Sequence, residues 1–129
     1  MRHEAVGDIV YEATTRLEPV KVGELAAAIG SPTSEATAAL VPWFGVTAGG
    51  QERLVDTLGM DLSRALLAGH KYEWGRPFEP GETVAVRVVV ESVFAKGDND
   101  FAVVVSEFRD DAGELIQRQQ TTFIERSAA

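Results

Sequence analysis

The sequence predicts a single α+β domain in which one helix packs on a curved antiparallel sheet. Three observations predict this class. Apolar residues recur every three or four positions in the first half, and they alternate every second position in the second half. No internal repeat or long linker divides the chain, so we expect one domain over residues 1–129.

Helical patterns occupy the first half of the chain. Residues 22–29 suit a short helix that Gly30 would end, and a polar loop follows it. Residues 40–50 contain a proline and three glycines, so this stretch should be irregular. Residues 51–67 place their apolar side chains on one face, which predicts an amphipathic helix that weakens or ends near Gly59.

The second half shows the two-residue period of strands. Turn-forming stretches separate the segments, and a proline-rich connection joins the first strand to the second. The last segment is polar on both faces over residues 117–120, which favours a strand that faces solvent or a partner subunit. The four predicted strands are residues 66–74, 83–93, 101–108 and 115–124.

Composition and charge exclude several classes of protein. The net charge of −8 and the scattered basic residues argue against a nucleic-acid partner. No apolar run approaches the roughly 18 residues of a membrane span, and the first residues lack the apolar core of a signal peptide. Because the chain has no cysteine, we expect no disulfide or thiolate metal site and a location in the reducing cytoplasm.

Four phrases of the sequence, taken in order, resemble the MaoC-like branch of the hot-dog superfamily. They are AAAIGSP, LVPWF, HKYEWGRPFEPGETV and AGELIQRQQTTFIER. The resemblance covers roughly residues 5–126 and implies a hot-dog fold, in which an antiparallel sheet wraps around a central helix. The third phrase carries the most specific pattern, which consists of His70, Trp74, Arg76, Pro77, Gly81 and Glu82.

The resemblance also implies a reaction, the reversible hydration of a 2-enoyl thioester on CoA or acyl carrier protein. Catalytic members use an aspartate and a histidine that converge on one water. Here Ser31 stands at the aspartate position and Ala36 at the histidine position, and neither side chain can pass a proton near neutral pH. The chain therefore resembles the dyad-lacking subunit of two-subunit 3-hydroxyacyl-ACP dehydratases.

Three other side chains are weak catalytic candidates, each with a milder interpretation that we favour. Glu35 would be a general base if it were buried, but a solvated loop residue has the same pattern. Asp56 lies on the predicted helix, where a solvent-side pair with Arg53 explains it. His70 heads a predicted strand, where a hydrogen bond to the backbone accounts for it without any catalytic role.

Six residues are candidates for an acyl pocket or an oxyanion site. Glycines just before a helix let a ligand oxygen approach exposed N–H groups, although they also serve as simple chain entries. The aromatic candidates would line an acyl chain, or else fill the core or a dimer seam. The six are Ser31, Trp43, Gly49, Gly50, Tyr72 and Trp74.

Three functions remain open at this point. The chain is a hydratase or dehydratase in its own right, a non-catalytic subunit of one, or a repurposed pocket in polyketide-type biosynthesis that binds, cyclises or hydrolyses a small molecule. We favour the subunit, with an acyl thioester as ligand and a homodimer or a heterodimer with a dyad-bearing MaoC-like chain as the assembly. No metal or cofactor is expected, because no cluster of His and carboxylates has ligand spacing.

Overall fold

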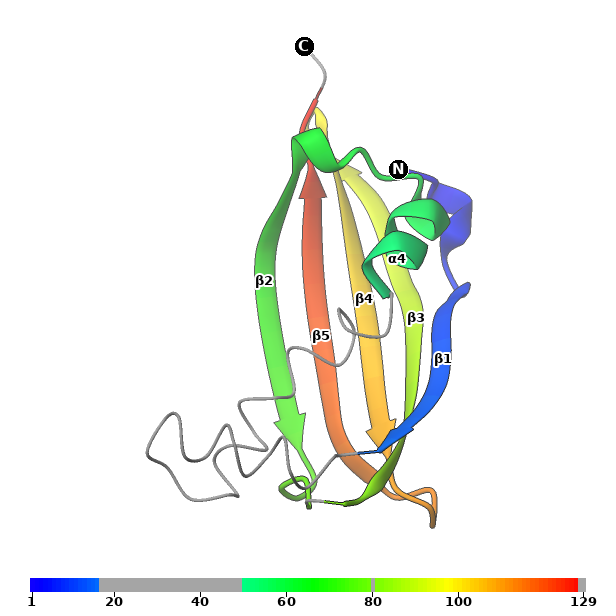
Figure 1. The fold of residues 1–129 in the computed structure, drawn as a ribbon. Helices are drawn as coiled ribbons and strands as arrows, with labels where there is room; N and C mark the ends of the chain where they lie inside the picture. The colour runs from blue at the N-terminus through cyan, green and yellow to red at the C-terminus, as the bar shows by residue number, and fades with distance from the viewer. Residues whose placement is uncertain (17–49, 80, 128–129) are drawn as a thin grey trace.

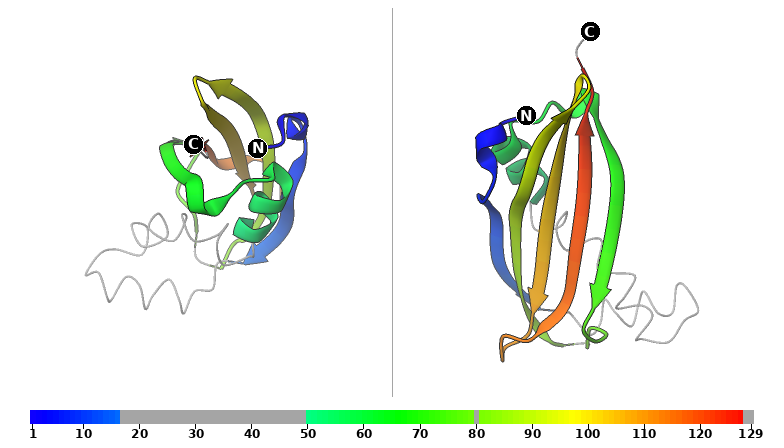
Figure 2. Two further views of the ribbon diagram at one scale, coloured as in Figure 1. Left: turned by 90° about the horizontal axis from the view of Figure 1, so that it is seen from above. Right: turned by 180° about the vertical axis from the view of Figure 1, so that it is seen from behind.

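The computed structural model describes residues 1–16, 50–79 and 81–127. Within them, a five-stranded antiparallel sheet in the order β1-β3-β4-β5-β2 curves around one helix, α4 (Figures 1 and 2). The predicted α+β architecture is confirmed. The strands are β1 (Ile9–Arg16), β2 (Ala65–Trp74), β3 (Thr83–Lys96), β4 (Asn99–Arg109) and β5 (Leu115–Glu125), and the helices are η1 (His3–Ala5), α4 (Gly50–Leu58) and η2 (Leu62–Arg64).

All four predicted strands are present, and each runs at least one residue further than its pattern indicated. The hairpin of β3 and β4 closes through a two-residue turn, because Lys96 pairs with Asn99. The strand β1 was not predicted. A bulge between Ile9 and Tyr11 places Val10 and Tyr11 in the core although they are consecutive, which breaks the two-residue period.

The helix α4 covers the first part of the predicted segment 51–67 and ends beside Gly59, where the sequence predicted that it weakens or ends. It ends at Leu58, where Gly59 adopts a positive φ of 59°. The Gly59 N–H donates to the Asp56 carbonyl (3.3 Å) and the Met60 N–H to the Val55 carbonyl (3.1 Å), which is the Schellman pattern of helix ends. The chain then reaches β2 through η2. The predicted helix 22–29 lies outside the described residues, and no described helix is long and apolar enough to cross a membrane.

The two faces of the sheet differ in chemistry. Apolar side chains of β3 and β4 cover the concave face, where Val84, Val90 and Phe108 are almost fully buried. Ion pairs cover the convex face, such as Arg87 with Glu12 (3.1 Å) and Arg118 with Glu91 (3.6 Å). The core therefore lies between the sheet and α4, on the inner side of the curve (Figure 2).

The polar last strand corrects one expectation. We expected this strand to face solvent or a partner, but β5 lies inside the sheet between β4 and β2. Gln117 is 0% exposed and Gln119 is 7% exposed. Gln120, which points to the convex face, donates to Glu91 (3.1 Å). The burial of Gln117 and Gln119 is tolerated because their side chains bond to each other, with Gln119 Nε2 donating to Gln117 Oε1 (2.8 Å).

The connection from β2 to β3 is held by one arginine. The Arg76 guanidinium donates to the Glu82 carboxylate, to the Asp110 carboxylate (3.3 Å) and to the Pro77 carbonyl (3.0 Å). These bonds join the β2–β3 connection to the turn between β4 and β5. The pattern that runs from His70 to Glu82 in the sequence thus has a structural reason, because its arginine and glutamate are ion-pair partners.

We predict that Glu82→Gln lowers the free energy of unfolding by about 2 kcal/mol at neutral pH. Burial alone would raise the pKa of the Glu82 carboxyl, but the hydrogen bonds from Arg76 and from the Glu79 N–H outweigh it and hold the pKa below its usual value. A lowered pKa means that this stabilisation is complete above the pKa of the unfolded chain and is lost as the pH falls through the folded pKa.

Urea unfolding from pH 7 downward measures this effect. The difference between wild type and Glu82→Gln should be constant above about pH 5 and shrink below it. Glu114→Gln is the matched control, because Glu114 is exposed in the neighbouring turn. A difference that stays the same at low pH would contradict the assignment.

Candidate functional site

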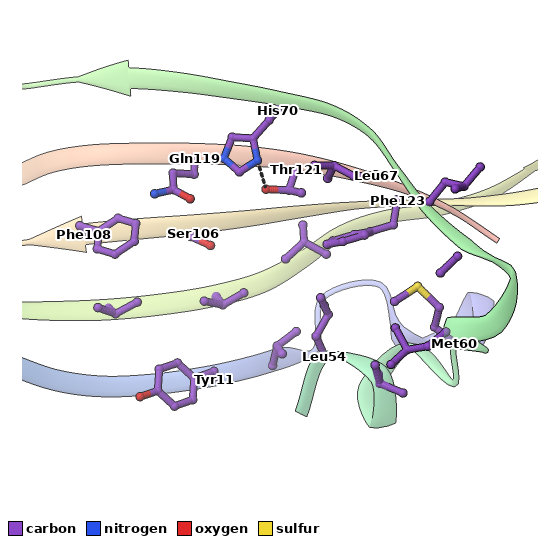
Figure 3. A pocket seen from close by; sticks show the side chains of 18 residues that line it. Tyr11, Leu54, Met60, Leu67, His70, Ser106, Phe108, Gln119, Thr121 and Phe123 are labelled. Atoms are coloured by element: carbon purple, nitrogen blue, oxygen red, sulfur yellow. Dashed lines mark hydrogen bonds between the residues drawn. The ribbon is translucent and has the colours of Figure 1, made fainter. Parts of the chain in front are cut away.

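A cavity of about 380 Å³ lies on the concave face of the sheet, between α4 and β2 (Figure 3). This volume is at the lower end of the roughly 300–1,000 Å³ typical of small-molecule sites. Leu54 and Val55 of α4 and Met60 close one side, and Phe123 and Leu67 contribute from β5 and β2. Most of the lining is aliphatic or aromatic, so the cavity suits an apolar ligand.

Four polar side chains interrupt this apolar lining, and they come from three adjacent strands. The register pairs His70 of β2 with Thr121 of β5, and Ser106 of β4 with Gln119 of β5. Thr121 and Gln119 are two residues apart on β5, so both point to the concave face. The four side chains lie together in Figure 3, and we call them the polar row.

Hydrogen bonds within the polar row are few. The His70 Nδ1 and Thr121 Oγ1 lie 3.3 Å apart, at the limit of a hydrogen bond. The His70 ring also lies against Tyr72, with 4.5 Å between the ring centroids. Gln119 donates to Gln117, whose own Nε2 is buried and has no hydrogen-bond partner among the described residues. We expected His70 to bond to the backbone, but the bond that the structure gives its ring is to a threonine hydroxyl.

Of the two catalytic candidates in the described residues, one lines the cavity. His70 lines it, whereas Asp56 is exposed on α4 and is not part of the lining. The expected ion pair between Arg53 and Asp56 does not form. Instead the Arg53 guanidinium lies over the Tyr11 ring, 5.4 Å from its centroid. Glu35 lies outside the described residues.

The pocket candidates are placed as follows. Gly50 is the first residue of α4, while Ser31, Trp43 and Gly49 lie outside the described residues. Tyr72 and Trp74 are on β2, 41% and 46% exposed, and neither belongs to the cavity lining. Trp74 packs edge-on against Phe78, with 5.8 Å between the ring centroids.

The described lining carries two side chains that could take part in proton transfer. Its titratable side chains are Tyr11 and His70, and it contains no carboxylate and no Lys or Arg. No group of three or more His, Cys, Asp or Glu that could hold a metal ion occurs among residues 1–16, 50–79 and 81–127. The sequence interpretation missed Ser106, Gln119 and Thr121 as site residues. Their only sequence signal was polarity at alternate positions of strands. This signal does not tell which face of the sheet the side chains occupy, or which of them are neighbours, until the register is known.

Comparisons with known proteins give the chain its relatives. The family model described as "FAS1-like, dehydratase domain region" matches residues 11–119. A UPF0336 protein of Streptomyces coelicolor is 30% identical over 125 residues, which are 97% of this chain and 79% of that protein.

Two solved structures are similar in fold. The C-terminally truncated HadBC (3R-hydroxyacyl-ACP dehydratase) complex of Mycobacterium tuberculosis has a TM-score of 0.68 at 19% identity, over 96% of this chain and 99% of that chain. A MaoC-like dehydratase of Rhodospirillum rubrum has a TM-score of 0.58 at 24% identity, over 97% of this chain and 94% of that one. At these identities the likeness shows a shared fold.

Proposed function

Because this chain belongs to the FAS1-like dehydratase-region family and has the MaoC-like hot-dog fold, we propose that it is a non-catalytic subunit of an acyl-thioester dehydratase or hydratase. In this proposal the chain shapes the acyl-binding cavity. A partner chain of the same fold supplies the aspartate and histidine. The substrate is an acyl group carried by CoA or by acyl carrier protein, and the site of action is the cytoplasm.

The observation that carries the proposal is the chemistry of the cavity. Hydration of an enoyl thioester needs a base that takes a proton from water and an acid that protonates the α-carbon. The described lining offers one imidazole, His70, and no carboxylate to share its proton transfers. In the sequence, Ser31 and Ala36 occupy the positions of the aspartate and histidine that catalytic relatives use.

The partner has a place to bind on β2. This strand is at the edge of the sheet, and all its residues after Ala65 are exposed. Among the described residues, β2 pairs on one side only, with β5, so the backbone groups of its ten residues on the other side can pair with another strand. HadBC, which has a similar fold, is itself a complex. We propose that a second hot-dog chain extends the sheet at β2.

The test is an assay of crotonyl-thioester hydration with three samples. These are the purified chain, a dyad-bearing MaoC-like chain encoded beside it, and an equimolar mixture of the two. We expect no hydration above the uncatalysed rate from the chain alone, and a higher rate from the mixture than from the partner alone. Robust hydration by the isolated chain would overturn the proposal, and Glu35→Gln and Asp56→Asn would then show which carboxylate acts.

A further inference from the structure

A row of charged side chains crosses the convex face of the sheet, with one residue on each described strand. We call it the charged row. Its charges alternate in sign from one edge of the sheet to the other, and opposite charges on neighbouring strands attract each other. The row begins and ends with a glutamate, at the two edge strands that Figure 1 shows. From β1 to β2, in the register of the strands, its members are Glu12, Arg87, Glu107, Arg118 and Glu73.

The two ends of the charged row are not equally well paired. At β1, the Glu12 carboxylate lies 3.1 Å from the Arg87 guanidinium, within hydrogen-bond distance. At β2, the Glu73 carboxylate lies 3.9 Å from the Arg118 guanidinium, which also faces the Glu91 carboxylate at 3.6 Å. One arginine thus serves two carboxylates beside β2. Glu73, whose side chain is 54% exposed, therefore keeps the capacity to pair with a further cation.

Lys71 gives the same edge a second charge, of opposite sign. It precedes Glu73 by two residues on β2 and pairs in register with Gln120, whose amide bonds to Glu91 on the convex face. The Lys71 ammonium makes no ion pair with another residue that the structure describes. Because alternate residues of a strand share one face, the convex side of the β2 edge presents Lys71 and Glu73 next to each other. The edge that the proposed partner would join thus carries a basic and an acidic side chain in a fixed order.

We propose that Lys71 and Glu73 select the partner chain and set the register in which its strand joins β2. The partner strand places a Lys or Arg opposite Glu73 and an Asp or Glu opposite Lys71, so that the alternation of the charged row continues across the interface. In antiparallel pairing this strand reads basic-x-acidic, and a slip of two residues brings like charges together. The inference rests on the proposed function, which supplies the partner and its place at β2, and it adds the side chains by which that partner is chosen.

Analytical ultracentrifugation of the full chain with the dyad-bearing chain encoded beside it tests the proposal. Glu73→Lys should weaken the association about tenfold at low ionic strength, because it sets two positive charges opposite each other. The loss should shrink as salt is added, since salt screens charges at an exposed edge, whereas a distorted strand would stay impaired. Changing the facing basic residue of the partner to Glu should restore the affinity for Glu73→Lys.

Glu12→Lys is the matched control, because Glu12 ends the same row at β1, has a side chain that is 56% exposed and gives the same change of charge. It should leave the affinity unchanged. Lys71→Glu should weaken the association as Glu73→Lys does, and it leaves the contact between Glu73 and Arg118 in place, so it gives the answer where Glu73→Lys does not fold.

The outcomes separate this inference from the proposed function. Wild-type affinity of both Glu73→Lys and Lys71→Glu, or equal weakening by Glu12→Lys, would overturn the inference and leave the subunit function standing. Tighter pairing of the chain with its own copy than with the dyad-bearing chain would overturn the choice of partner. No association of the wild-type chain with the dyad-bearing chain would overturn both the inference and the proposed function.

Discussion

Gly75→Ala is expected to lower the free energy of unfolding by about 3–4 kcal/mol, the largest effect of any single substitution considered for this chain. A Cβ at position 75 would lie 2.2 Å from the Leu115 carbonyl oxygen and 3.3 Å from that of Ile116. Both obstacles are backbone atoms of β5, so no side-chain rotation relieves them. The Gly75 N–H also donates to the Ile116 carbonyl (2.7 Å), and this bond holds the backbone at position 75 close to β5.

Urea or thermal unfolding of the purified variants measures the effect. Gly69→Ala is the control, because Gly69 lies in β2, the strand that Gly75 directly follows, and a Cβ at position 69 would meet nothing within 4 Å. Neither glycine has a positive φ, so the comparison isolates the close approach from backbone strain. Equal stabilities of the two variants would show that β2 and β5 can separate at this corner, contrary to the geometry described.

The fold could be predicted from the sequence wherever its pattern was regular. The alternating valines of β3 and the turns on either side of β4 indicated strands that the structure contains. The pattern did not predict the structure where a local irregularity of the backbone interrupted it. A bulge near Tyr11 concealed β1. The end of α4 was predicted, because Gly59 marked it although apolar residues continue at helical spacing beyond it.

The candidate site was harder to predict, because its residues come together through register. His70 stood out from its phrase, but its neighbours Thr121 and Gln119 are about 50 residues away in the sequence and are adjacent only because β2 pairs with β5. The polarity of β5 favoured a strand that faces solvent or a partner subunit. A single sequence does not tell which side chains of a polar strand turn inward, and this depends on the two strands beside it.

Tyr72→Asp is expected to weaken association with the partner chain about 100-fold, and to reduce the hydration rate of dilute mixtures with it. Tyr72 lies in the middle of β2 and is 41% exposed. Among the described strands, β2 is at the edge of the sheet, where a partner strand would run. Burying a tyrosine at the centre of an interface is one of the larger single contributions to binding, whereas an aspartate there would lose its hydration without gaining a positive partner.

Titration by light scattering or analytical ultracentrifugation measures the dissociation constant, and Thr14→Asp is the matched control. Thr14 is exposed on β1, the strand at the opposite edge of the sheet, so this variant adds the same charge to a chain of net charge −8 at a place that the proposed partner does not cover. Because β1 and β2 are both edge strands among the described residues, a general tendency of edges to pair would make the two variants associate equally weakly with the partner. Weakening by Tyr72→Asp alone assigns the interface to β2, and weakening by Thr14→Asp alone would move it to β1.

Since Tyr72 lies outside the cavity lining, Tyr72→Asp should also leave fatty-acid binding to the isolated chain unchanged, which separates loss of the partner from loss of the pocket.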